Sequence, residues 1–334
     1  MINFYILIAF FFLNLSFLIF FNNIKVFHQI IDKPDKKRKF HKKPTPLAGG
    51  IILFFNIILY AILCFINNDL LIEEIIFKNF LEFKLFIISC ISFFIIGILD
   101  DKYNIKPSIK FSFLIILIFI LLYFDSNLKI IEINFSFLDI SINSINYSII
   151  FTLFCILVFI NSFNMFDGIN LQASTYSLIL ISILIFYLKF SLFLNILLIF
   201  ILCFKYLNFK NKTFLGDNGT LLISFIFSFI FIKLYNENII IHSDEIFIYM
   251  MVPGIDMIRL FFTRILMNRS PFSDDRIHIH HLLLDKFTYL QSLIIINSLI
   301  LMPILLMKVN INNLFSILLT ITLYTVIIIK IKKV

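Results

Sequence analysis

The chain has 334 residues, of which 61% are hydrophobic and only 14% are charged, and its mean hydropathy is +1.03. A soluble domain is roughly half apolar and about a quarter charged. This composition therefore excludes a water-soluble domain and predicts an all-α polytopic membrane protein. The four cysteines lie in apolar runs and form no CxxC pair, which favours small buried hydrophobes over disulfide or metal chemistry.

Apolar runs predict about eleven transmembrane helices in a single membrane-embedded domain, residues 1–334. The expected spans are 3–24, 46–66, 84–99, 109–124, 148–164, 171–188, 190–207, 219–234, 246–265, 288–307 and 314–330. The first run has no basic start and no small-residue cleavage site, which favours a membrane helix over a removable signal peptide. Residues 129–147 alternate between apolar and polar side chains, a pattern typical of a small β-hairpin.

The basic residues are distributed unequally between the two sides that these spans define. Of the 28 Lys and Arg, six fall on the side of the hairpin: Lys78, Lys84, Lys129, Lys189, Lys233 and Lys308. The others fall on the opposite side, which the positive-inside rule assigns to the cytoplasm. We therefore expect the N-terminus outside, the C-terminus in the cytoplasm and the hairpin on the extracytoplasmic side.

The acidic residues predicted to face the cytoplasm are all aspartates, which suggests a site rather than general solubility. They are Asp32, Asp35, Asp100, Asp101, Asp167, Asp217, Asp256, Asp274, Asp275 and Asp285. Helix N-caps and turns also favour Asp. That plainer interpretation accounts for Asp32, Asp35 and Asp285.

The first motif, DKPDKKRKFHKKPTPLAGG, runs from Asp32 to Gly50 and is strongly basic. Its basic residues alone favour an ordinary cytoplasmic loop that holds anionic headgroups. The Pro-rich ending with Gly49 and Gly50 favours a ligand site, because glycines let backbone approach a ligand closely. Lys43, just ahead of them, is a candidate for gripping phosphate.

Two further motifs place polar groups at predicted span ends. In GILDDKYNIKPSIK, the adjacent carboxylates Asp100 and Asp101 repel each other, and Lys110 follows. Charges near a membrane interior are usually functional, although a solvated helix cap is the alternative. In NSFNMFDGIN, Asn161, Asn164 and Asp167 recur at every third residue, so their side chains lie along one stripe at a helix end. The alternative role of these polar side chains is interhelical hydrogen bonding.

The fourth motif, FLGDNGT, holds Asp217 between glycines at a span entrance. This suits Mg²⁺, which takes one or two carboxylates plus substrate phosphate oxygens, and equally suits a turn with an Asp N-cap. The fifth motif ends in SPFSDDRIHIHHLL. Its His-x-His-His pattern lacks the His-Glu-x-x-His signature of zinc enzymes. We therefore favour Arg276, His278, His280 and His281 as donors to phosphates and nucleotide.

Together these five motifs resemble those of the polyprenyl-phosphate N-acetylhexosamine-1-phosphate transferase family, the WecA/MraY group, and its WecA-like branch in particular. RKFHKKPTPLAGG resembles the first cytoplasmic motif, and GILDDKYNIKPSIK the Asp-Asp motif. NSFNMFDGIN, FLGDNGT and SPFSDDRIHIHHLL resemble the Asn-x-x-Asn-x-x-Asp-Gly motif, the Gly-Asp-x-Gly-Ser motif and the His-x-His-His loop. The motif order and the membrane side match over essentially the whole chain.

The resemblance implies transfer of N-acetylhexosamine-1-phosphate from a UDP-sugar to undecaprenyl phosphate, with release of UMP. Mg²⁺ is the implied cofactor, and Mn²⁺ is its alternative. On this basis Asp217 is the main metal ligand with Asp167, and Asp100 positions or deprotonates the lipid phosphate with help from Asp101. Phosphate and nucleotide binding would fall to polar and basic residues: Lys43, Lys110, Asn161, Asn164, Arg276, His278, His280 and His281.

The resemblance also implies a multi-pass protein of a bacterial inner membrane whose site faces the cytoplasm. The reaction would be the first membrane step in the synthesis of a cell-surface glycan such as lipopolysaccharide or O-antigen. A homodimer is implied as well. No nucleic-acid partner is expected. Attack is either direct or through a covalent aspartyl intermediate.

The sequence departs from the family pattern at Asn170, where an aspartate is usual, and at Thr220, which replaces a serine. The opening loop also has one residue more than expected between Asp32 and Arg38. Two alternatives remain. One is an ion-coupled transporter, which requires its carboxylates near the membrane midplane. The other is a non-catalytic homologue that binds lipid or nucleotide, suggested by Asn170.

Overall fold

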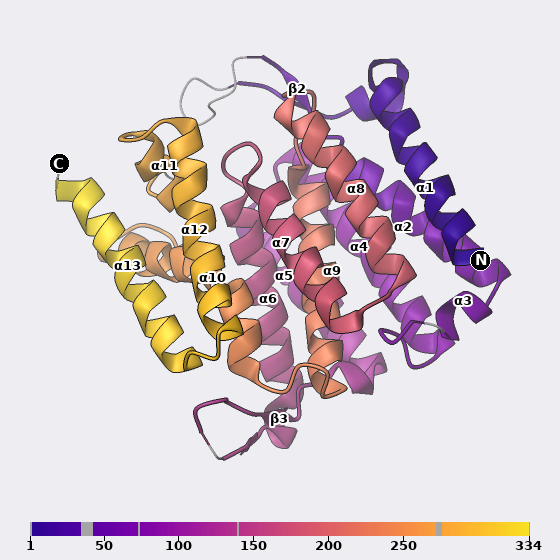
Figure 1. Cartoon of the computed structure of the whole chain (residues 1–334). Helices are drawn as coiled ribbons and strands as arrows, with labels where there is room; N and C mark the ends of the chain where they lie inside the picture. The colour runs from indigo at the N-terminus through magenta and orange to yellow at the C-terminus, as the bar shows by residue number, and fades with distance from the viewer. Residues whose placement is uncertain (1, 35–42, 73, 139, 272–275, 334) are drawn as a thin grey trace.

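The computed structural model describes residues 2–34, 43–72, 74–138, 140–271 and 276–333, and these are predominantly helical (Figure 1). The long helices are α1 (Ile2–Ile19), α2 (Gly49–Ile66), α4 (Phe80–Tyr103), α5 (Pro107–Phe124), α6 (Ser148–Phe166), α7 (Gln172–Leu188), α8 (Leu192–Phe209), α9 (Gly216–Asn236), α10 (Ser243–Leu266), α12 (Tyr289–Lys308) and α13 (Asn313–Lys333). The shorter helices are α3 (Asp69–Ile72) and α11 (Ile279–Leu284), with 3₁₀ turns η1 (Phe21–Asn23), η2 (Lys25–His28), η3 (Ser126–Leu128) and η4 (Ile145–Tyr147).

Each of the eleven predicted spans corresponds to one long helix, which confirms an all-α polytopic membrane protein. Among the described residues, ten of these helices are long and apolar enough to cross a membrane. The eleventh, α7, is apolar but has 17 residues, slightly fewer than the usual span.

Local signals set several helix starts. The Asn79 side chain accepts the backbone N–H of Glu82 at 2.9 Å at the start of α4, and Ser191 caps α8 in the same way. Thr288 and Gln291 form a capping box at the start of α12. Such caps satisfy backbone donors that the first turn of a helix leaves unpaired.

Helix α9 is the centre of the bundle, because its whole apolar window is buried whereas only 11% of that of α1 is buried. Helices α4, α6, α2 and α7 pack around it, and α1 and α13 lie at the periphery (Figure 1). The strongest packing is between α9 and α4. Side chains at the two ends of the α4–α9 pair are therefore positioned by the most buried helix of the bundle.

Successive long helices alternate in direction, so the bundle has two distinct ends. One end, at the top of Figure 1, carries β2 and α11 and is called the site end; the other carries β3 and is called the hairpin end. The C-terminus of α4 and the N-terminus of α9 meet at the site end. The assignment of the site end to the cytoplasm stays a prediction.

The predicted hairpin within 129–147 is present but short. Strands β3 (Glu132–Ile133) and β4 (Ile142–Asn143) pair antiparallel over two residues each. The buried carboxylate of Asp244 accepts hydrogen bonds from Ser136 of this segment and from Asn313 of α13. The hairpin segment is therefore fixed to α10 through Asp244, which is itself bonded to α13.

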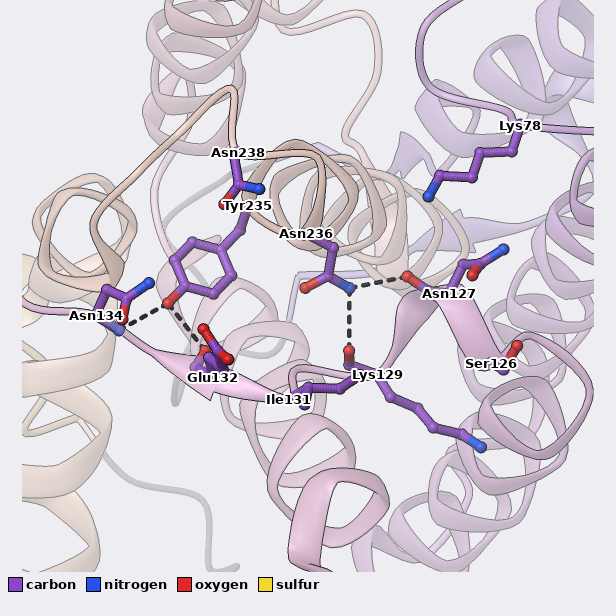
Figure 2. A pocket seen from close by; sticks show the side chains of 10 residues that line it. All are labelled: Lys78, Ser126, Asn127, Lys129, Ile131, Glu132, Asn134, Tyr235, Asn236 and Asn238. Atoms are coloured by element: carbon purple, nitrogen blue, oxygen red, sulfur yellow. Dashed lines mark hydrogen bonds between the residues drawn. The ribbon is translucent and has the colours of Figure 1, made fainter. Parts of the chain in front are cut away.

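A cleft of about 350 Å³ lies at the hairpin end (Figure 2). The Tyr235 hydroxyl donates to the carbonyl of Glu132, and the Asn236 amide donates to the carbonyls of Asn127 and Lys129. These bonds tie the C-terminal end of α9 to the connection that precedes α6.

Candidate active site

Asp101 from the last turn of α4 caps the N-terminus of α9. Its carboxylate accepts the backbone N–H groups of Asp217 and Asn218, each at 2.9 Å, and the side-chain amide of Asn218 at 2.5 Å. A carboxylate at a helix N-terminus satisfies unpaired donors and interacts favourably with the helix dipole. The contact fixes the direction in which the first turn of α9 presents Asp217.

Asp217 lies among four of the predicted site residues. Lys110 of α5 places its ammonium 3.5 Å from the Asp217 carboxylate and 2.6 Å from that of Asp100. The Asn164 amide of α6 donates to Asp217 and, at 2.7 Å, to the Thr220 hydroxyl. The Asp217 side chain nevertheless keeps 32% of its surface exposed, so it is both oriented and accessible.

Asp100 accepts hydrogen bonds from two nearby residues, Lys110 and Ile105. One of its carboxylate oxygens accepts from Lys110 and the other accepts the backbone N–H of Ile105 at 2.9 Å. With both oxygens bonded, Asp100 orients Lys110. Asp100, Asp101, Asp217 and Lys110 are defined here as the carboxylate centre.

The predicted close approach of Gly49 and Gly50 to a ligand is wrong in this structure, because both glycines approach the protein's own backbone. Their N–H groups donate to the carbonyls of Phe214 and Leu215 at 3.0 and 3.1 Å. A Cβ added to Gly50 would lie 1.8 Å from the Asn218 side-chain oxygen. The end of the first motif thus packs against the start of α9.

The first motif and the residues before α9 are also joined by contacts that lie upstream of Gly49. Strands β1 (Ile31–Asp32) and β2 (Thr45–Pro46) form a two-residue antiparallel ladder that the sequence did not predict. The carbonyl of Pro46 accepts from the Phe214 N–H and the Thr213 hydroxyl, and Thr213 in turn accepts from the Ala48 N–H. The first and fourth motifs therefore form one structural unit.

Asp167 ends α6 beside this unit. Burial, and then the negative charge of Asp217, raise the pKa of Asp167 to about 7. A carboxyl group that is buried beside another carboxylate is a candidate for binding a cation, whose charge would favour its ionised form.

Asn170 has a structural role that an aspartate would not reproduce. Its amide donates to the carbonyl of Asn208 at 2.7 Å and to the side-chain oxygen of Asn211 at 2.8 Å. Asn208 also accepts the Leu171 N–H at 2.9 Å. An ionised aspartate has no donor to offer these acceptors. Sequence reasoning missed Asn208, whose only signal was an amide at the end of an apolar run.

The predicted histidine motif reaches the loop after Asp167. A Cβ added to Gly168 would lie 1.8 Å from Nε2 of His280, so the two loops are in direct contact. His280 is 1% exposed, and neither of its ring nitrogens has a hydrogen-bond partner among the described residues. Burial, followed by the charges of His281 and His278, holds the pKa of His280 well below its usual range. His280 is therefore neutral. The sequence suggested His280 as a donor to phosphates but did not indicate whether its ring carries a charge.

Three other predicted residues stand apart from the carboxylate centre. The Asn161 amide donates to the carbonyl of Leu157 within its own helix, at 2.8 Å, so it does not join Asn164. Lys43 and Arg276 are exposed, and their role in phosphate binding stays a prediction. Lys36, Lys37, Arg38, Lys39, His41 and Lys42 of the first motif, together with Asp35, Asp274 and Asp275, lie outside the described residues.

The donor set fits Mg²⁺ through Asp217 and Asp167. The described residues contain no ready-made group of three or more metal ligands among His, Cys, Asp and Glu. Mg²⁺ needs only one or two carboxylates when substrate phosphates and water complete its coordination. Within the described part of the chain, Asp100 and Asp217 share the ammonium of Lys110, and Asp167 adds a further carboxylate beside Asp217. This excess of negative charge favours a bound divalent cation.

A cavity of about 370 Å³ adjoins the carboxylate centre at Asp101. Ile31, Asp32 and Lys33 line one side, and Lys102 and Asn104 line another. The cavity is open enough to admit polar atoms next to the α4 and α9 termini.

The depth of the carboxylates disfavours a transporter. Asp100 and Asp101 lie in the last turn of α4, Asp167 caps the end of α6, and Asp217 lies in the first turn of α9. A carrier would place its ion-binding groups near the middle of the bundle. The cluster is instead at one end, where a water-soluble and a lipid-borne substrate can meet.

Comparison with known proteins identifies relatives over most of the chain. The family model for glycosyl transferase family 4 matches residues 83–235. The undecaprenyl-phosphate alpha-N-acetylglucosaminyl 1-phosphate transferases of Yersinia pestis and Escherichia coli K12 are each 27% identical, over 87% of this chain and 79% of their own length. A probable undecaprenyl-phosphate N-acetylglucosaminyl 1-phosphate transferase of Bacillus subtilis is 28% identical over 76% of this chain and 69% of its own.

Proposed function

Because the chain belongs to glycosyl transferase family 4, we propose that it transfers an N-acetylhexosamine-1-phosphate from a UDP-sugar to undecaprenyl phosphate and releases UMP. The observation that carries this proposal is the open carboxylate centre at the meeting point of α4, α5, α6 and α9. The named relatives make N-acetylglucosamine the first donor to test.

In the proposed reaction, an oxygen of the lipid phosphate attacks the sugar-bearing phosphorus of the UDP-sugar. A new phosphorus–oxygen bond forms, the pyrophosphate bond to the uridine-bearing phosphate breaks, and UMP leaves with the bridging oxygen. Both substrates are anions, so the main catalytic requirement is to neutralise their repulsion and hold them in line.

Asp217 and Asp167 would hold Mg²⁺, with Mn²⁺ as the alternative ion. When bound, the ion supplies positive charge to the pyrophosphate oxygens and to the leaving phosphate. The Asn164 amide donates a hydrogen bond to Asp217, which supports a role for Asn164 in positioning this carboxylate.

Lys110 supplies the fixed positive charge of the site. Its side chain is 16% exposed and its ammonium is anchored by Asp100, so it can contact a phosphate oxygen without losing its orientation. Asp101 acts indirectly, since its oxygens bind the N-terminus of α9. We therefore propose that Asp101 is a positioning residue and that Asp100 orients Lys110.

We further propose that the site end faces the cytoplasm of a bacterial inner membrane, where the UDP-sugar is available. The excess of lysine and arginine in the connections at this end supports that orientation. The prenyl chain of the acceptor would lie along the exposed apolar helix faces.

The test is UMP release by the protein purified in detergent, with undecaprenyl phosphate, Mg²⁺ and a panel of UDP-N-acetylhexosamines. We expect UMP formation that requires lipid and metal and that Asp217→Asn lowers by about 10³-fold or more, the loss of several kcal/mol of charge stabilisation. No UMP from any donor, in a preparation that binds UDP-sugar, would establish the non-catalytic alternative.

A further inference from the structure

A buried carboxylate of α10 attaches the segment Arg276–His281, called here the histidine loop, to the bundle. Asp256 of α10 accepts the backbone N–H of Ile279 at 3.2 Å, and its second oxygen lies 3.3 Å from Nδ1 of His278. Asp256 is 3% exposed. A carboxylate in contact with one ring nitrogen of a histidine fixes the ring orientation and directs the other nitrogen outward.

A second attachment comes from the guanidinium of Arg259, one turn further along α10. Its Nη2 donates to Asp256 at 2.8 Å and to the carbonyl of Ile277 at 2.5 Å. Its Nε donates at 2.7 Å to the hydroxyl of Tyr324. Arg259 therefore spans the histidine loop, its own helix and a third element.

That third element is α13, which contributes Tyr324. Its hydroxyl accepts from Arg259 and donates to Asp256 at 2.5 Å, and the side chain is 1% exposed. Three side chains from two helices are thus joined by hydrogen bonds in a buried position, where such bonds restrict the geometry of the groups that they connect. None of the five sequence motifs includes α13.

We propose that Asp256, Arg259 and Tyr324 form a positioning network through which α13 sets the place of the histidine loop against the UDP-sugar. The inference rests on the proposed function and extends it to a helix outside the motifs. The loop contacts Gly168 through His280, and Gly168 directly follows Asp167. A shift of the loop would therefore move groups that lie next to the proposed metal-binding carboxylates, where the UDP-sugar would be held.

The test compares Tyr324→Phe with Tyr187→Phe, two changes that each remove one hydroxyl and keep the ring. Tyr187 is a matched control, because its hydroxyl donates at 2.7 Å to Glu245, a carboxylate near the other end of the same helix α10. Steady-state UMP release is measured against each substrate in turn, with thermal denaturation of the same samples.

We expect Tyr324→Phe to raise the KM for the UDP-sugar by about tenfold, the low end for losing a hydrogen bond to a charged group. The KM for undecaprenyl phosphate should stay within about twofold of wild type, and Tyr187→Phe should leave both constants unchanged. A merely structural defect would instead lower kcat through a smaller active fraction and leave both KM values alone.

Unchanged constants in Tyr324→Phe, a fall in kcat alone, or a rise in the KM of the lipid phosphate would each overturn the inference. Should Tyr324→Phe fail to fold, Arg259→Lys keeps the charge but loses the fork that reaches both Tyr324 and the Ile277 carbonyl. It should give the same rise in KM. A wild type that binds UDP-sugar but forms no UMP refutes the proposed function instead, so the two failures are distinguishable.

Discussion

A lysine lies between carboxylates at both ends of the α4–α9 helix pair, but only one of these clusters is open. At the hairpin end, Lys233 lies 3.1 Å from Glu82 and 3.0 Å from Asp125, and the three side chains are 1%, 4% and 1% exposed. At the site end, Lys110 lies between Asp100 and Asp217, with Asp217 32% exposed.

The two clusters also differ in how much negative charge surrounds the lysine. At the hairpin end, Glu82 accepts from Asn127 and from the Lys78 backbone, and Asp125 accepts from Asn127 and Lys233. At the site end, Asp167 adds a further negative charge beside an accessible Asp217. A lysine–carboxylate cluster in a membrane helix pair thus stabilises the fold when sealed, and becomes a binding site when open and rich in negative charge.

Among the changes that compare the two ends, the largest effect on activity is expected from Lys110→Met. Among the described residues, Lys110 is the ammonium that contacts both Asp100 and Asp217, so without it the substrate phosphates would meet uncompensated carboxylates. We expect kcat/KM to fall by about 100-fold or more, in line with the loss of one preorganised charge contact. UMP release, normalised to folded protein, measures this, and a loss below threefold would contradict the role given to Lys110.

Lys233→Met is the matched change at the hairpin end and should act on stability instead. Removing one partner of a sealed ion cluster typically costs about 3–5 kcal/mol, because the remaining carboxylates stay buried without compensation. Thermal denaturation in detergent should show a clear drop in Tm, whereas turnover per folded molecule stays near wild type. Equal loss of turnover in both lysine variants would contradict the assignment of activity to the Lys110 cluster and of stability to the Lys233 cluster.

Gly168→Ala should perturb the site end alone. The added methyl group would collide with the His280 ring, so the histidine loop must move away from the loop that follows Asp167. We expect turnover to fall by about tenfold or more with a small change in Tm. Gly254→Ala is the control, since a Cβ there meets no atom within 4 Å among the described residues.

The smallest of these effects is expected from Asn170→Asp, which restores the residue usual in the family. The aspartate would lose the donor that serves Asn208 and Asn211, at a cost of about 1–3 kcal/mol for unpaired groups. We expect a lower Tm and no gain in turnover. A gain in UMP release would mean that Asn170 limits the chemistry, which its contacts do not suggest.

Much of the fold could be predicted because hydropathy and charge are local properties of the chain. All eleven apolar runs became helices, and the 129–147 hairpin was found. The predicted span 171–188 corresponds to α7, which has 17 residues and is slightly shorter than a usual membrane span. Gly49 and Gly50 were misread, because their real neighbours lie about 165 residues further along the chain.

The sequence by itself determined the membrane class, the alternation of the helices and the gathering of Asp100, Asp101, Asp167 and Asp217 at one end, since these follow from span lengths and parity. Only the tertiary structure decided which of these carboxylates is accessible. Asp101 is occupied by the α9 terminus 116 positions away, and Tyr324 reaches Asp256 across 68 positions. Hydrogen-bond partners of this kind depend on how helices pack, and no local pattern records that packing.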